Sequence, residues 1–318
     1  MGFKTVSTNP CGEIPLCPYD SCRLLAINLY SYVINPFTKK AYFDFDLFKE
    51  HVAYAQRIMD DILDLELEKI DQIIAKIDAD PEPFDIKRTE RELWVKIKDK
   101  AIQGRRTGIG ITGEGDMLAA LGLQYGSDAA IDFSEEVHKT LAINVYKSSV
   151  RLAIDRGAFP IFDFEKEKNN PFINRLFAID PALEDEMKKH GRRNISMLTI
   201  APTGSVSILT QTTSGIEPVF SIFYKRRRKV NPNDKTVKIS FVDELGDAWE
   251  EYNVFHPKFL TWLEINGYSI NDITSNFSDD KINELIPVSY THLRAHETVL
   301  DIVCRLLLEK KKNKHTLT

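Results

Sequence analysis

The stretch "TNPCGEIPLCPYDSC" places an amide, a thiol and a carboxylic acid at every second position, as Asn9, Cys11 and Glu13. Pro10 and Gly12 lie between them, and both residue types are poor helix formers. In an extended segment, residues two apart point to the same side. We therefore predict an extended loop whose three polar groups face one small target together.

A second segment whose residue types suit ligand binding is "SMLTIAPTGSVSILTQTTSGIEPVF". Its apolar run predicts a strand that leads to the start of a helix. Hydroxyl groups, a glycine and the free N–H groups of a helix start are suited to binding phosphate. An ordinary helix N-cap with a Thr/Ser-rich turn explains the pattern equally well, and the G-K-[ST] ending of a Walker P-loop is absent. The candidate phosphate-binding residues are Pro202, Thr203, Gly204, Ser205 and Ser207.

Two further motifs favour structural explanations. "GIGITG" (Gly108 to Gly113) matches G-x-G-x-x-G, but a charged helical stretch precedes it where a dinucleotide site needs a strand, so we predict a glycine-rich strand. Cys11, Cys17 and Cys22 lack the paired C-x2-C spacing of a zinc site, so we predict no metal site.

The bulk composition of the 318 residues is that of a globular protein, with 43% hydrophobic and 28% charged residues. A net charge of -5 argues against nucleic acid or an anionic membrane as the main partner. No apolar run approaches the roughly 20 residues that span a bilayer. Four cysteines make no disulfide framework, and a reducing cytoplasm fits best.

The hydrophobic pattern predicts long helices alternating with short buried strands. We expect helices from Phe45 to Leu63, from the break at "DADPEPFD" to Gly104, and from Ser134 to Gly157. The third would face inward through Val137, Leu141, Val145 and Leu152, while "TGIGIT", "AFPIF" and "SMLTIA" would be strands. This alternation predicts an α/β fold with a mainly parallel sheet. The basic run "YKRRRK" (Tyr224 to Lys229) is typical of a solvated face.

The last residues do not continue this pattern, so we divide the chain into a catalytic part, residues 1–287, and a tail, residues 288–318. The tail resembles translated adapter or read-through sequence and is expected to be non-native. His292 and His296 stand four residues apart, as metal ligands on a helix do, but we set them aside together with Cys304.

Taken together, "NPCGEIPL", "SCRLLAINL", "RRTGIGITGEGD", "APTGSVSILTQTTSGIEPVF" and "YKRRRKVNPND" resemble the catalytic subunit of ribonucleotide reductase, in the same order and register. The resemblance runs from about Gly2 to Pro287 and is closest to the adenosylcobalamin-dependent class. It implies a helix-rich part of a ten-stranded α/β barrel whose central finger loop carries Cys11 at its tip. It also implies radical reduction of ribonucleotides to 2′-deoxyribonucleotides for DNA synthesis.

The resemblance assigns roles to the motif residues. It implies that Cys11 becomes a thiyl radical that takes the 3′-hydrogen, that Glu13 is the general base for the 3′-OH, and that Asn9 holds the hydroxyls. Cys22 matches one member of the redox-active cysteine pair, and Cys17 matches no member. The "PTGSVS" turn would hold the substrate phosphates. Thioredoxin or a similar reductant, dNTP/ATP effectors and a homodimer are the partners implied for the full-length protein.

Departures from the family pattern leave alternatives open. Arg23 to Ala26 replace an Asn-Leu-Gly/Ala-Ser type of sequence, and Glu114 stands where an apolar residue is usual. We expect the first barrel strands, the partner of Cys22 and the effector site to lie outside this chain, which alone would be inactive. Two alternatives are a reductase whose radical comes from a separate metal-cofactor subunit, and a non-catalytic nucleotide- or metal-binding module.

Overall fold

The computed structural model describes residues 3–231, 233–234, 236–276 and 278–285, so the predicted tail with His292, His296 and Cys304 lies outside the described residues. The chain forms two compact units, each described by itself below. The first comprises Met1–Tyr32, Phe43–Thr112 and Asp132–Gly204, and the second comprises Val33–Tyr42, Gly113–Ile131 and Ser205–Thr318.

A parallel sheet forms the centre of the first unit. Strands β3 (Leu24–Asn28) and β6 (Gly108–Thr112) pair in parallel, with Leu24 opposite Gly108. On its other side β6 pairs with the segment around Leu198, where Ile109 N–H donates to Met197 O (2.6 Å) and Thr199 N–H donates to Ile109 O (3.0 Å). The predicted α/β class with parallel strands is therefore confirmed, and "GIGITG" is the predicted structural strand.

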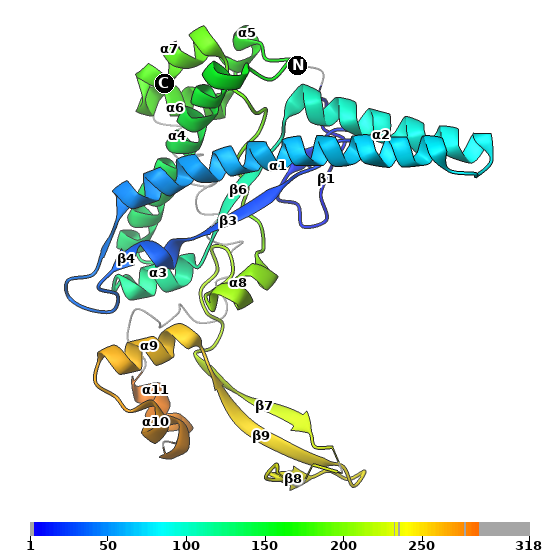
Figure 1. The fold of residues 1–318 in the computed structure, drawn as a ribbon. Coiled ribbons are helices and arrows are strands. Elements are labelled where there is room, and N and C mark those ends of the chain that lie inside the picture. Colours follow the sequence, from blue (N-terminus) through cyan, green and yellow to red (C-terminus); the bar gives the residue numbers. More distant parts are fainter. Residues whose placement is uncertain (1–2, 232, 235, 277, 286–318) are drawn as a thin grey trace, which may run out of the picture. The chain divides into compact units, whose positions relative to one another are not determined.

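Two long helices, α1 (Phe45–Ala79) and α2 (Phe84–Gly104), lie side by side and connect β3 to β6 (Figure 1). The predicted start at Phe45 is right, because the Asp44 side chain accepts the Leu47 N–H (3.0 Å). The predicted end at Leu63 is wrong. Buried Ile70 and Ile77 continue the apolar stripe, and the helix ends only at the "DPEP" break.

Helix α4 (Asp128–Arg156) begins six residues before the predicted Ser134, because the Ser127 hydroxyl caps it by accepting the Ala130 N–H (3.3 Å). It ends as predicted before Gly157, which has a φ of +84°. The four predicted core residues of this helix are all buried: Val137, Leu141, Val145 and Leu152.

The segment "AFPIF" is not the predicted strand. Pro160 has no N–H group, and the chain turns there, with Phe162 N–H donating to Phe159 O (2.9 Å). Phe159 is buried, so the apolar residues of this segment reflect packing in the core and not pairing in a sheet.

The second unit contains an antiparallel ribbon of β7 (Phe223–Lys229), β9 (Ala248–Phe255) and β8 (Phe241–Val242), with β9 in the middle. The basic run on β7 is exposed, as predicted, and it faces acids of β9: Arg227 pairs with Glu251 (2.8 Å) and Arg228 pairs with Glu250.

No helix among the described residues is long and apolar enough to cross a membrane. The remaining elements are β1 (Ser7–Thr8), β2 (Pro15–Leu16), η1 (Leu29–Tyr32), β4 (Val33–Ile34), β5 (Tyr42–Phe43), α3 (Glu114–Ala120), α5 (Phe164–Glu167), α6 (Pro171–Ile179), α7 (Pro181–His190), α8 (Gly204–Thr210), α9 (Pro257–Ile265), α10 (Ile270–Asn276) and α11 (Asp279–Leu285).

Candidate active site

The predicted reactive stretch forms a hairpin, in which β1 and β2 pair antiparallel and Cys11 lies exposed at the tip. The extended loop predicted for Asn9 to Glu13 is wrong. Gly12 N–H donates to Asn9 O (3.0 Å), and Gly12 adopts a φ of +75°. Asn9 closes the loop through its side chain, whose Oδ1 accepts the Ile14 N–H (3.1 Å). The loop is therefore a tight turn.

A cavity of about 570 Å³ lies at the hairpin tip in the first unit. It brings Cys11 and Glu13 together, as predicted, and Asn9 and Cys22 do not line it. The other walls come from α4, from α6 and from the segment that pairs with β6. The lining residues are Cys11, Gly12, Glu13, His138, Leu141, Ala142, Phe172, Leu198, Thr199 and Ile200.

Two of the lining residues carry an oxygen atom that is buried without a hydrogen-bond partner among the described residues: Glu13 Oε2 and Thr199 Oγ1. Leaving such groups unpaired costs about 1–3 kcal/mol each. A carboxylate accepts hydrogen bonds and a hydroxyl both donates and accepts them. The cavity is therefore suited to a ligand that presents hydroxyl groups, and its volume is in the range of small-molecule sites.

Cys22 lies near Ile14, the residue that follows Glu13, and does not line the cavity. A Cβ atom on Gly108 would lie 2.7 Å from Cys22 Sγ and 3.1 Å from Cδ1 of Ile14, so the bare glycine leaves the space that these side chains fill. Burial raises the pKa of the Cys22 thiol to about 12. The Cys22 thiol is therefore protonated at neutral pH, near the residue that follows Glu13.

Cys17 is buried and has a structural contact. Its thiol donates to Asp20 Oδ2 (3.6 Å), and the same carboxylate accepts a hydrogen bond from Arg106 Nε (2.7 Å). Burial, followed by the charge of Asp20, raises the pKa of Cys17. Among the described residues, no three His, Cys, Asp or Glu side chains come together as metal ligands.

The predicted phosphate-binding residues lie where the chain passes from the first unit to the second. In the first unit, Thr203 Oγ1 lies 3.0 Å from Thr112 Oγ1, and a Cβ on Gly204 would meet no atom within 4 Å. In the second unit, Ser205 is exposed, while Ser207 is buried and its hydroxyl lies 2.8 Å from that of Ser214. Helix α8 begins at Gly204, as the sequence predicts.

Comparison with known proteins gives the family. Residues 4–305 match the family described as "Ribonucleotide reductase, barrel domain". The chain belongs to the ribonucleotide reductase family. It is similar to the "Vitamin B12-dependent ribonucleoside-diphosphate reductase" of Mycobacterium tuberculosis, with 30% identity over 221 residues, which is 69% of this chain and 25% of the relative.

Two further relatives carry ribonucleoside-diphosphate reductase names. The "Vitamin B12-dependent ribonucleoside-diphosphate reductase" of Thermoplasma acidophilum is 32% identical over 249 residues, covering 75% of this chain and 26% of that protein. The "Ribonucleoside-diphosphate reductase subunit alpha" of Helicobacter pylori is 30% identical over 146 residues, covering 39% of this chain and 18% of that protein. The chain thus spans about a quarter of the length of the B12-dependent relatives that it matches.

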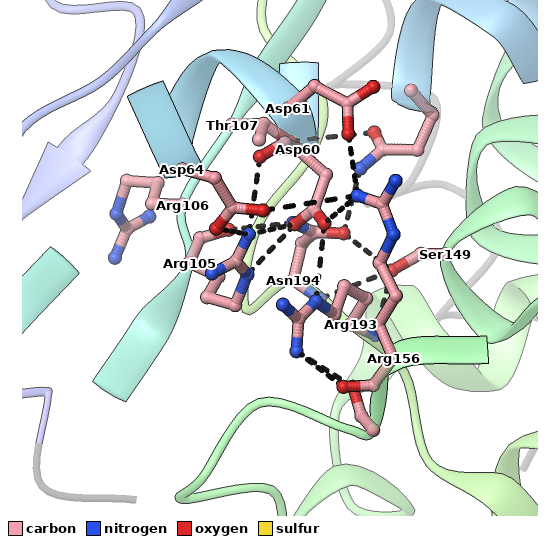
Figure 2. A network of polar contacts seen from close by, with 12 residues as sticks. Asp60, Asp61, Asp64, Arg105, Arg106, Thr107, Ser149, Arg156, Arg193 and Asn194 are labelled. Atoms are coloured by element: carbon pink, nitrogen blue, oxygen red, sulfur yellow. Dashed lines mark hydrogen bonds and ion pairs between the residues drawn. The ribbon is translucent and has the colours of Figure 1, made fainter. Parts of the chain in front are cut away.

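A buried polar network supports the strands of this reductase domain (Figure 2). The Asp60 carboxylate on α1 accepts hydrogen bonds from Arg105 Nε (2.8 Å), Arg156 (3.0 Å) and Arg193 Nε (3.2 Å). Asn194 also donates to it (3.0 Å) and accepts from Gln56 (2.8 Å). Burial alone would raise the pKa of Asp60, but the charge and hydrogen bond of Arg105, with help from its other partners, lower it below its ordinary value.

This network joins α1 to the chain just before β6 and just before the segment that pairs with β6. Arg105 follows α2 in a left-handed conformation (φ +48°), and Asn194 also donates to the Arg105 carbonyl (3.0 Å). The second connection holds the beginning of the segment whose residues Leu198, Thr199 and Ile200 line the cavity. The network is therefore part of the frame that positions the site.

Sequence reasoning missed several residues of the candidate site. His138 stands beside Val137 on α4, three residues before Leu141, and its place on this face was the only signal for it. Thr199 was read only as part of a buried strand, although it directly precedes the "IAPTGS" turn. The Asp60 network had no local signal, because its members are far apart in the sequence.

Proposed function

We propose that this chain forms part of the catalytic centre of a ribonucleotide reductase, which replaces the ribose 2′-hydroxyl group of a ribonucleotide with hydrogen. The observation that carries the proposal is the cavity shared by Cys11 and Glu13, in which Glu13 Oε2 is buried without a partner among the described residues. A thiol and an unpaired carboxylate oxygen beside one ligand-sized space suit a substrate that presents both a C–H bond and hydroxyl groups.

The roles proposed for the hairpin follow from the family resemblance. Cys11, as a thiyl radical, takes the 3′-hydrogen atom, and Glu13 accepts the proton of the 3′-OH. Asn9 uses its Oδ1 to close the turn, so the Nδ2 group is the part of this side chain that would donate to a substrate hydroxyl. Cys22 supplies reducing electrons as one member of a cysteine pair. Its position near Ile14, the residue that follows Glu13, supports this role.

The remaining proposals concern the surrounding fold and the phosphates. We take the hairpin as the finger loop and the three parallel segments as part of a ten-stranded barrel. The open space around Gly204 and the exposed position of Ser205 support phosphate binding by this segment. The proposed phosphate-binding residues are Pro202, Thr203, Gly204, Ser205 and Ser207. We also propose that the chain divides at residue 287 and that residues 288–318 are non-native.

Adenosylcobalamin is the proposed radical source, a proposal supported by the names of the two B12-dependent relatives. When bound, it supplies a radical by homolysis of its cobalt–carbon bond. The 570 Å³ cavity has a volume in the range of nucleotide-sized ligands, and the Cys11 thiol that would hold the radical is exposed and lines it. We assign none of the described residues to holding the cofactor.

The proposed partners are a thioredoxin-type reductant, dNTP/ATP effectors and a second copy in a homodimer, with the cytoplasm as the compartment. These proposals rest on the family.

Ligand protection of Cys11 tests the proposal on the chain itself. Ribonucleoside diphosphates bound in the cavity should slow alkylation of Cys11 by iodoacetamide, because the thiol lines the cavity. Tandem mass spectrometry of the peptide that contains Cys11, Cys17 and Cys22 reports each thiol separately. If none of ADP, CDP, GDP and UDP slows the alkylation of Cys11 at millimolar concentration, the proposed substrate site is wrong.

Catalytic roles are tested in a chimaera in which this chain replaces the matching quarter of the Thermoplasma relative. Cys11→Ser should abolish cobalamin-dependent reduction and leave nucleotide binding intact, whereas the matched control Cys17→Ser should remain active. Glu13→Gln keeps the shape and removes the base, so the rate should fall by roughly 10²–10⁴-fold. A Glu13→Gln change that affects only substrate affinity would reassign Glu13 to binding.

A further inference from the structure

Thr199 is held in a fixed orientation at the wall of the cavity. Its N–H donates to Ile109 O (3.0 Å), which places its backbone in the parallel sheet. A Cβ on Gly110 would lie 2.6 Å from the Thr199 carbonyl oxygen and 3.4 Å from its Cγ2 methyl group. The methyl group therefore lies close to β6. Because a β-branched side chain has few χ1 rotamers, this packing also fixes the direction of the hydroxyl group.

The Thr199 hydroxyl differs from those of other buried threonines. The residue is 6% exposed and lines the cavity, and its Oγ1 has no hydrogen-bond partner within the part of the chain that the structure describes. Elsewhere in the described residues, buried threonine hydroxyls have partners: Thr107, Thr112, Thr212 and Thr213. A buried hydroxyl without a partner is costly, so a ligand that pairs with it is bound more tightly.

Two of the residues that line the cavity carry an unpaired buried oxygen, and a ribose presents two neighbouring hydroxyl groups. Glu13 Oε2 is the proposed acceptor for the 3′-OH, which leaves Thr199 Oγ1 for the 2′-OH. A hydroxyl group both donates and accepts, so it can pair with another hydroxyl whichever of the two donates. We propose that Thr199 is a further substrate-binding residue that contacts the ribose 2′-OH and sets the preference for ribonucleotides over 2′-deoxyribonucleotides.

This inference rests on the proposed function and adds a consequence to it. The product lacks the 2′-OH, so its binding leaves the Thr199 hydroxyl buried and unpaired again. A site built to pair with a hydroxyl discriminates against the analogue that lacks it. Thr199 therefore favours binding of the substrate and release of the product, without taking part in a covalent step.

Three diphosphates and two variants test the contact. Dissociation constants for ADP, 2′-deoxyADP and 3′-deoxyADP are measured through protection of Cys11 from iodoacetamide, in the wild-type chain, in Thr199→Val and in Thr199→Ser. Thr199→Val keeps the shape of the side chain and removes the hydroxyl, so it should weaken binding of ADP and of 3′-deoxyADP by about tenfold. It should leave binding of 2′-deoxyADP unchanged. Thr199→Ser retains the hydroxyl and should bind ADP nearly as the wild type does.

The outcomes separate this inference from the proposed function. If no nucleotide protects Cys11 in the wild type, both are wrong. If ADP protects the wild type and Thr199→Val equally well, or if the valine variant loses affinity for all three diphosphates alike, the proposed function stands and the Thr199 contact is wrong. A loss seen with 2′-deoxyADP but not with 3′-deoxyADP would place the 3′-OH at Thr199 and also overturn the inference. Far-UV circular dichroism checks that both variants fold.

Discussion

Replacing Asp60 by asparagine should destabilise the first unit strongly, although the two side chains have nearly the same shape. The carboxylate is fully buried and accepts hydrogen bonds from Arg105, Arg156 and Arg193. An asparagine in its place keeps one acceptor oxygen and presents an NH₂ group to a neighbouring guanidinium. Buried positive charge is then left with less compensation, and this is the costly part of breaking a buried ion pair.

The expected magnitude follows from the partners that remain. Breaking a buried pair by removing one member typically costs about 3–5 kcal/mol. Arg105 keeps Asp64 (2.7 Å), and Arg156 keeps Asp61 (2.7 Å), both half-exposed carboxylates. Because two of the three arginines retain a partner, we expect the lower end, about 3 kcal/mol in the free energy of unfolding. The measurement is urea unfolding followed by far-UV circular dichroism.

The pH dependence of this difference gives a second test. The folded-state pKa of Asp60 lies below its ordinary value, so its contribution is fully present above the unfolded pKa of about 3.9 and is lost as the pH falls through the folded pKa. The gap between wild type and Asp60→Asn should therefore be constant from pH 7 to about pH 5 and shrink at lower pH.

The matched control is Asp61→Asn, one residue along the same helix, where the side chain is 48% exposed and pairs with Arg156. Its effect should stay within about 1 kcal/mol, as for other exposed ion pairs. An Asp60→Asn variant that is no less stable than Asp61→Asn would refute the view that the network holds the unit together.

Two further predictions concern Cys22 and its neighbour Gly108. Since burial raises the Cys22 pKa to about 12, iodoacetamide at pH 8 should modify exposed Cys11 long before Cys22, and Cys22 labelling should rise about tenfold per pH unit between pH 8 and 10. Equal rates for the two thiols at pH 8 in the mass spectra would contradict the buried position of Cys22. Gly108→Ala places a Cβ 2.7 Å from Cys22 Sγ and 3.0 Å from Leu24 Cδ2, so urea unfolding should show a loss of about 1–3 kcal/mol. Gly204→Ala, where a Cβ meets nothing within 4 Å, should stay within about 0.5 kcal/mol, and equal effects of the two changes would refute the crowding at Gly108.

The sequence predicted those elements whose signals are local. Apolar residues at helical spacing marked the start of α1, Gly157 marked the end of α4, and a short apolar run marked β6. The end of α1 was missed because charged residues after Leu63 interrupt the apolar stripe, which resumes at Ile70 and Ile77. Periodicity does not show whether an apolar run with a proline, such as the one around Pro160, pairs in a sheet or turns.

The candidate site was predictable in its chemistry but not in its geometry. Cys11 and Glu13 do share one cavity, yet a turn closed by Asn9 brings them there instead of the predicted alternation along a strand. Thr199 and His138 reach the same cavity from distant parts of the chain, and a single sequence carries no signal for such long-range contacts.

The Asp60 network also has a consequence for the order in which the domain folds. Arg105, Arg156 and Arg193 follow Asp60 by 45, 96 and 133 residues along the chain. At common rates of translation, Arg193 is synthesised on the order of 10 s after Asp60. During that interval α1 and α2 can already associate, whereas the carboxylate must stay hydrated until its last partner has left the ribosome. Closure of this core is therefore a late event, set by the completion of synthesis rather than by the speed of helix formation.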